Sequence, residues 1–284
     1  MIATETAVMA IVLLLGTAAE PATISTTPLG VTQSVGQQKD PSPDPEVEES
    51  TGRLPKGEEA SPGEHLGANL AGSDTAGYTM HDFLEYSVKD IDAFWSNVWE
   101  AAGYTQPEVE YYFPTPGEVT DTSCGPSDDE TAAYCPADDL ITFSQAMAVK
   151  IWEGAAKTNT DANSTYPAGD FSVAYAIAHE YAHSLQDDLG IIQATSGQTR
   201  RFPIYKTELH ADCWAGIWAN STFHKGTLEP GDIEEAVRTT MDLGSYDSSD
   251  DQFHGTPAQR RDAFLTGWNS GVASQCDRYL LVDH

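Results

Sequence analysis

The residues best suited to chemistry are two histidines and a glutamate in the segment AIAHEYAHSLQ. His179 and His183 are four residues apart, so on a helix they lie about 40° from each other on one face. Their ring nitrogens can therefore share one metal ion, as in zinc sites. Glu180 lies at the edge of the same face, where a carboxylate can hold a water molecule near the metal and accept its proton. This His-Glu-x-x-His spacing predicts a zinc-dependent hydrolytic site.

The alternative is that His179 and His183 are surface histidines on an amphipathic helix, because so short a pattern also occurs by chance. The residues around them are apolar, which favours a buried site: Ala174, Ile177, Ala178, Ala182 and Leu185. Asp170 can cap this helix at its start, and Gly190 can end it. The sequence therefore predicts a buried helix between Asp170 and Gly190 that carries the metal site.

A catalytic zinc ion has three protein ligands and an open position for water, so a third ligand is needed. The segment TELHADCWAGIWA places Glu208 and Asp212 four residues apart on a second predicted helix, which Thr207 can cap. Glu208 can bind the metal, while Asp212 accepts a hydrogen bond from a liganding imidazole. A solvated acidic pair is disfavoured, because like charges at this spacing destabilise a helix. His210 points away from Glu208 and is the weaker ligand candidate.

His254 is a candidate for a further catalytic role. Amide cleavage creates a developing oxyanion that needs hydrogen-bond donors, and His254 or a tyrosine such as Tyr205 can supply one. His254 opens the segment HGTPAQR, in which Thr256 and Pro257 can begin a helix that runs to about Gly267. The alternative for His254 is a loop histidine tied to the backbone, and both interpretations stay open.

Other elements must position these residues. Apolar side chains recur at helical spacing from His81 to Ala102, and Gly103 supplies a stop, which predicts a core helix. The runs EVEYYF (108–113) and LITF (140–143) are typical of short strands. A further helix is expected over 144–156.

The composition limits the functions that are open to this chain. Its 284 residues include 44 acidic and 14 basic side chains, with a formal net charge of −30. Nucleic acid would be repelled, so we expect no nucleic-acid partner. All tryptophans and phenylalanines lie from Phe83 onward, which predicts one folded domain over 76–284. Residues 23–75 are acidic, rich in Pro, Ser and Thr, and without hydrophobic periodicity, which predicts a disordered linker or pro-segment.

The N-terminus carries an apolar stretch from Ala7 to Ala19. It is shorter than the roughly 20 residues of a membrane span and suits the core of a signal peptide over 1–22. No Lys or Arg precedes it, so an uncleaved membrane anchor and a misplaced start codon stay as alternatives. We therefore expect a secreted or extracytoplasmic protein with no stable membrane span in its mature chain.

Four cysteines lie in the predicted domain, at Cys124, Cys135, Cys213 and Cys276. In an exported chain an even number of cysteines favours disulfides. The pairing Cys124–Cys135 is the most economical because it closes a short loop of turn-forming residues, and it leaves Cys213 with Cys276. Four free thiols would fit a cytosolic protein better.

Several segments together resemble a known family: YCPADDLITF, AIAHEYAHSLQ, ELHADCWAGIWA, GDIEEAV and HGTPAQR. They occur in the order seen in the bacterial neutral zinc metallopeptidases, over residues 82–280. The resemblance implies a zincin-like α+β domain, mainly helical with a small β-sheet, with a zinc site between two helices. Its His-Glu-x-x-His and Glu-x-x-x-Asp motifs resemble the gluzincin arrangement. The resemblance implies that the metal ligands are His179, His183 and Glu208. It also implies that Glu180 is the general base and that Asp212 is the carboxylate that supports a ligand. Tyr181 and Ala182 stand where relatives often have Val and Gly, and neither is a ligand.

These features predict a zinc peptidase with one zinc ion per chain, acting on peptide or protein substrates. One alternative is a non-catalytic zinc-binding protein of the same fold. Another is a zinc hydrolase acting on a non-protein amide, such as a cell-wall peptide. Glu180 favours an enzyme, since metal ligation does not need it, but nothing in the sequence separates the two substrate classes.

Overall fold

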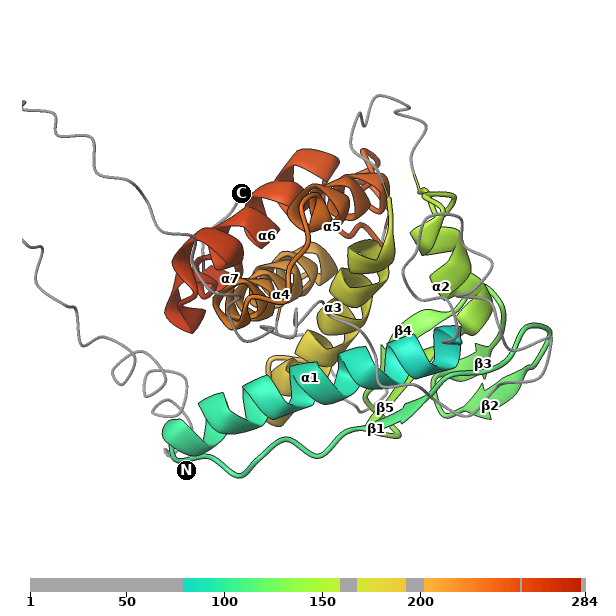
Figure 1. Ribbon diagram of the computed structural model, residues 1–284, viewed down its shortest axis with the longest axis horizontal. Helices are drawn as coiled ribbons and strands as arrows, with labels where there is room; N and C mark the ends of the chain where they lie inside the picture. The colour runs from blue at the N-terminus through green and yellow to red at the C-terminus, as the bar shows by residue number, and fades with distance from the viewer. Residues whose placement is uncertain (1–78, 159–167, 193–201, 251, 282–284) are drawn as a thin grey trace, which may run out of the picture.

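The structure is a computed structural model that describes residues 79–158, 168–192, 202–250 and 252–281. The expected signal peptide and the expected linker or pro-segment lie outside the described residues. The described chain forms a mainly helical α+β fold, as predicted (Figure 1). Its elements are α1 (Met80–Ala101), β1 (Glu110–Tyr112), β2 (Thr120–Thr122), β3 (Gly125–Ser127), β4 (Ala132–Cys135), β5 (Leu140–Phe143), α2 (Gln145–Trp152), α3 (Asp170–Asp188), α4 (Ile204–Lys225), α5 (Asp232–Asp242), α6 (Pro257–Ser270), the short 3-10 helix Ala273–Gln275 and α7 (Arg278–Leu281).

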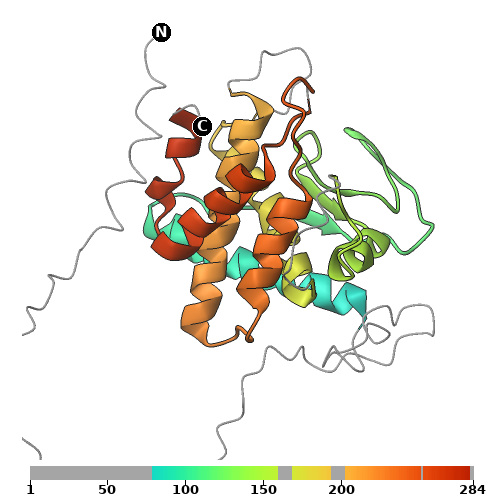
Figure 2. The same ribbon diagram turned by 90° about the horizontal axis from the view of Figure 1, so that it is seen from above.

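Helix α3 lies in the middle of the fold. The strands and α2 lie on one side of it, and α4 to α7 lie on the other (Figures 1 and 2). Fourteen of the 19 residues of α3 are buried, which explains its nearly continuous apolar sequence. No helix in the described ranges is long and apolar enough to span a membrane.

The main sheet has three strands in the order β1-β5-β4. β5 pairs with β1 in parallel and with β4 antiparallel, so β4 is an edge strand. β2 and β3 form a separate antiparallel pair. The sequence predicted β1 and β5 but missed β2, β3 and β4. These three strands read TDT, GPS and AAYC, and Asp, Gly, Pro and Ala are residues that strands usually lack.

Several helix boundaries differ from the prediction. Helix α4 begins at Ile204, so Thr207 lies inside the helix and is not its cap; its hydroxyl donates to the Ile204 carbonyl. Helix α2 follows the cap Ser144 as expected but ends at Trp152, earlier than predicted. The predicted cap Thr256 accepts from the main-chain N–H of Gln259, 3.2 Å away. Helix α5 was not predicted as a helix.

Helices α4 and α6 cross in direct backbone contact. A Cβ atom on Gly216 of α4 would lie 2.1 Å from the Phe264 carbonyl oxygen, and one on Gly267 of α6 would lie 1.8 Å from the Cys213 oxygen. Only glycine permits an approach this close. The crossing places the first turns of α6 beside the middle of α4, where Asp212 lies.

Both disulfides favoured by the sequence are present. Cys124 pairs with Cys135, and Cys213 pairs with Cys276. The second bond ties α4 to the segment just before α7, and its two cysteines have a sequence separation of 63. It therefore fixes the C-terminal end of the domain to one of the helices that carry the site.

Peptide mapping without reductant is expected to show these two linked pairs and no free thiol. Reduction should destabilise the domain, since removing a native disulfide typically costs about 2–5 kcal/mol in small exported domains. Alkylation of unreduced protein followed by mass measurement tests this. Any cysteine that takes up the alkylating reagent would contradict the pairing.

Candidate metal centre

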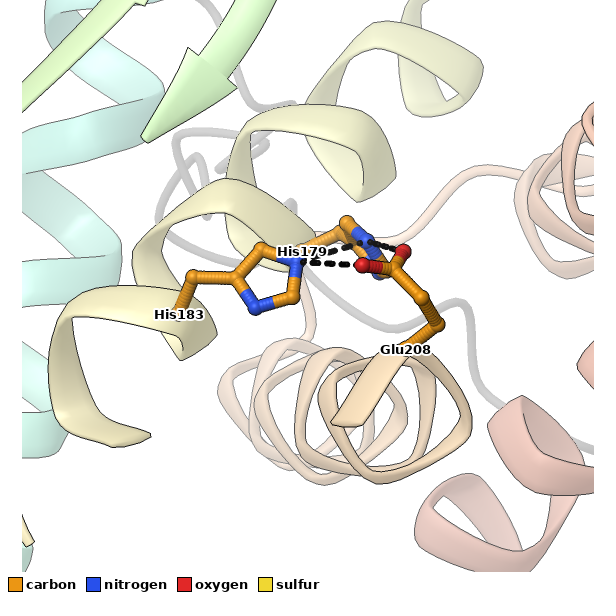
Figure 3. Close-up of side chains that lie close together, drawn as sticks. All are labelled: His179, His183 and Glu208. Carbon is orange, nitrogen blue, oxygen red and sulfur yellow. Dashed lines mark hydrogen bonds and ion pairs between the residues drawn. The ribbon is translucent and has the colours of Figure 1, made fainter. Parts of the chain in front are cut away.

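Two histidines of α3 and a glutamate of α4 converge on one point (Figure 3). Nε2 of His179 lies 3.2 Å from Nε2 of His183 and 3.1 Å from Oε2 of Glu208. Nε2 of His183 lies 3.3 Å from Oε1 of Glu208. His179 and Glu208 are buried, with 5% and 8% of their surface exposed. Helical spacing brings His179 and His183 together, and the packing of α4 against α3 adds Glu208, the third predicted ligand.

Polar contacts on the far side of each imidazole, an ion pair for His179 and a hydrogen bond for His183, indicate where its proton lies. Nδ1 of His179 is 2.8 Å from Oδ1 of Asp212, and Nδ1 of His183 is 2.9 Å from Oε1 of Gln186. Both partners are oxygen acceptors, so each Nδ1 carries a proton and each Nε2 offers a lone pair to the common point.

This donor set fits a zinc ion. Two imidazole lone pairs and a carboxylate that converge within hydrogen-bond distance need a positive charge among them, which a metal ion supplies, or a proton in its place. Two nitrogen ligands and one oxygen ligand are a usual set for catalytic zinc. Ligands of a tetrahedral zinc ion with bonds of about 2.0–2.1 Å lie roughly 3.3 Å apart, close to the 3.1–3.3 Å separations observed.

The charges of the site hold Glu208 ionised. Burial would raise the pKa of its carboxyl, but His183 and His179 hold that pKa well below its usual range. A ligand that stays ionised does not have to lose a proton before it binds a metal.

Glu180 lies beside the cluster but is not part of it. Its Oε2 accepts a hydrogen bond from the main-chain N–H of Tyr134 in β4, at 2.9 Å. Burial raises the pKa of the Glu180 carboxyl, and the neighbouring His179 and His183 oppose that shift. The edge strand therefore orients a carboxylate whose basicity is increased by its surroundings.

A buried network that the sequence did not reveal supports Asp212. Arg260 of α6 donates from Nε to Oδ2 at 2.8 Å and from Nη2 to Oδ1 at 2.9 Å, and the Tyr175 hydroxyl also donates to Oδ1. Burial alone would raise the pKa of Asp212, but Arg260 and then His179 lower it to about 2. Asp212 is thus ionised, fully buried and aimed at His179. The sequence predicted Asp212 but gave no signal for Arg260 or Tyr175.

The other predicted residues lie elsewhere. His210 is fully buried, and its Nδ1 bonds to Gln186 rather than joining the ligand cluster. His254 lies half-buried in the loop before α6, without a hydrogen bond or ion pair to the described residues, and its catalytic role stays a prediction. The ring of Tyr205 lies 6.1 Å from that of Phe253, beside this loop.

Comparison with known proteins identifies the family. The sequence profile described as "Putative neutral zinc metallopeptidase" matches residues 55–279. The uncharacterized protein YpfJ of Escherichia coli strain K12 is 32% identical over 205 residues, which cover 65% of this chain and 66%, just under two thirds, of that protein. The uncharacterized protein Rv2575 of Mycobacterium tuberculosis is 29% identical over 219 residues, 68% of each chain. No solved structure matches significantly. Since the profile covers most of the chain, this protein belongs to the neutral zinc metallopeptidase family.

Proposed function

We propose that this protein is a secreted zinc peptidase with a zincin-like catalytic domain. In this proposal His179, His183 and Glu208 bind one zinc ion between α3 and α4, and Glu180 is the general base. The observation that carries it is the convergence of two imidazole lone pairs and an ionised carboxylate at separations of 3.1–3.3 Å. Such a set of donor atoms suits a zinc ion, which can bind all three at once.

Each residue of the site has a defined task in this reaction. Zinc, when bound, supplies Lewis-acid polarisation of the scissile carbonyl and of water. Glu180 accepts the proton of the attacking water at its carboxylate and then delivers it to the leaving amine. Asp212 keeps the proton of His179 on Nδ1, so that Nε2 faces the metal. His254 is the proposed donor to the developing oxyanion.

Glu180 favours catalysis over simple metal storage. The Tyr134 N–H orients its carboxylate next to the ligands, although ligation does not require it. A structural zinc site closes all four positions with protein ligands, whereas the described residues here supply three. Peptides or proteins are the proposed substrates, in line with the family name.

The proposed domain plan is a signal peptide over 1–22, a linker or pro-segment over 23–75 and the peptidase domain over 76–284. Two disulfides are compatible with an extracytoplasmic location. The acidic net charge of −30 suits a solvated surface in such a setting.

Purified protein is expected to contain about one zinc ion per chain, because three ligand atoms of a tetrahedral site converge at one point. Elemental analysis after purification with added zinc measures the zinc content. Cleavage of a diverse peptide library, with and without a chelator, tests the peptidase activity. Less than about a tenth of an equivalent of zinc would refute the metal site. Cleavage that is unaffected by the chelator would refute zinc catalysis.

A further inference from the structure

Gln186 is a buried polar residue one helical turn beyond the proposed ligand His183. Its side chain is fully buried between α3 and α4, and a buried amide destabilises a protein unless its hydrogen-bonding groups are satisfied. In Gln186 both N–H groups and the carbonyl oxygen have a hydrogen-bond partner. Nε2 lies 2.8 Å from the Thr207 carbonyl oxygen and 3.0 Å from Nδ1 of His210, and Oε1 lies 2.9 Å from Nδ1 of His183.

The direction of these hydrogen bonds follows from the partners. A main-chain carbonyl only accepts, so the NH₂ end of the Gln186 amide must face Thr207. The oxygen end then faces His183, which must carry its proton on Nδ1 to donate to it. With that proton in place, the lone pair of His183 lies on Nε2 and points at Glu208.

His210 completes the chain of hydrogen bonds. Its Nδ1 accepts the second N–H of Gln186, so its own proton lies on Nε2. That Nε2 is 4.0 Å from Oδ1 of Asp277, whose negative charge favours a proton there. The His210 ring is held in place by Trp214, with ring centres 4.2 Å apart. Glu208, Thr207 and His210 share the first turns of α4, so one helix supplies a ligand and also orients the amide.

We infer that Gln186 is a positioning residue that fixes the tautomer of His183, and that His210 orients Gln186. The inference rests on the proposed zinc site. Each liganding histidine has its own partner: Asp212 with its full negative charge for His179, and the neutral amide of Gln186 for His183. Hydrogen-bond partners of this kind typically change metal affinity by about 10–100-fold when they are removed.

The test compares two buried glutamines. Gln186→Met keeps the length of the side chain but removes both ends of the amide, and we expect zinc affinity to fall by about 10–100-fold. Gln145→Met is the matched control, because Gln145 on α2 is equally buried and donates from Nε2 to the Phe113 carbonyl, at 3.0 Å. The control should lose stability and keep the parental zinc affinity. Competition with a chelator on metal-free protein measures the affinity, and thermal unfolding measures the stability.

His210→Phe should lower zinc affinity by a smaller factor, because the bond from Gln186 to Thr207 remains. Parental zinc affinity in folded Gln186→Met would overturn the inference for Gln186. Parental affinity in His210→Phe would overturn the part assigned to His210. Equal losses in Gln186→Met and Gln145→Met would show that the effect is general destabilisation, which also overturns it.

A second measurement needs no variant. Imidazole ¹⁵N chemical shifts of the metal-free parent protein, taken at a pH where the His183 ring is neutral, should show Nδ1 protonated and Nε2 unprotonated. An unprotonated Nδ1 would overturn the inference even if Gln186→Met did not fold. If the parent protein bound no zinc, the proposed function would fail, while the ¹⁵N shifts would still decide how Gln186 and His183 are paired.

Discussion

Replacement of Glu180 by Gln is expected to reduce peptide hydrolysis by about 10²–10⁴-fold, or more, and to leave zinc content unchanged. The amide oxygen of Gln can still accept the Tyr134 N–H that holds Glu180 at 2.9 Å, so the geometry is kept. An amide cannot take a proton from water near neutral pH, so the proposed base is lost. Steady-state cleavage of a peptide that the parent cleaves, together with elemental analysis, measures both quantities.

Glu208→Gln is the control for this experiment. It replaces a proposed ligand that interacts with both histidines, so zinc occupancy and activity should fall together. Retention of full turnover by Glu180→Gln would show that Glu180 is not the base, even if the proposed ligands were correct. Loss of zinc from Glu180→Gln would instead indicate that Glu180 takes part in metal binding.

Arg260→Met is expected to destabilise the domain by about 3–5 kcal/mol, because it leaves a buried carboxylate without its cation. Arg260 and Asp212 are 3% and 0% exposed and are joined by two hydrogen bonds. Arg260 also donates to the Leu243 carbonyl at the end of α5, so the loss affects three helices. Denaturant unfolding of metal-free protein with its disulfides intact measures the change.

The neighbouring arginine provides a matched control. Arg261 forms its ion pair with Asp262 at the surface, where such pairs contribute at most about 1 kcal/mol. Arg261→Met should therefore unfold close to the parent protein. If Arg260→Met were no less stable than Arg261→Met, the buried pair would not be the support for Asp212 that the geometry indicates.

The parts of the site that depend on helix geometry could be predicted from the sequence. His179 and His183 share a face because a helix turns 100° per residue, and Glu208 and Asp212 share a face for the same reason. Two residues on one face of a helix stay close together however that helix packs in the fold. The motifs also predicted the family, and the comparison confirmed it. The resemblance also implied the mainly helical α+β class, although the strands β2, β3 and β4 lack residues typical of strands and were not predicted.

The groups that reach the site from distant segments could not be predicted, because their positions depend on how the helices and strands pack. Tyr134, on the strand β4 that was not predicted, contacts Glu180 from 46 residues earlier in the chain. Arg260 contacts Asp212 from 48 residues later. Gln186 lies at the end of the segment AIAHEYAHSLQ, which carries the zinc motif. Its proposed role in orienting His183 nevertheless depends on α4, which supplies the Thr207 and His210 partners of its amide. No local period encodes such contacts, because they arise from helix crossings such as the glycine contact between α4 and α6. Local spacing therefore placed His179 beside His183, while long-range packing brought Glu208 to them and determined the contacts that orient the proposed ligands.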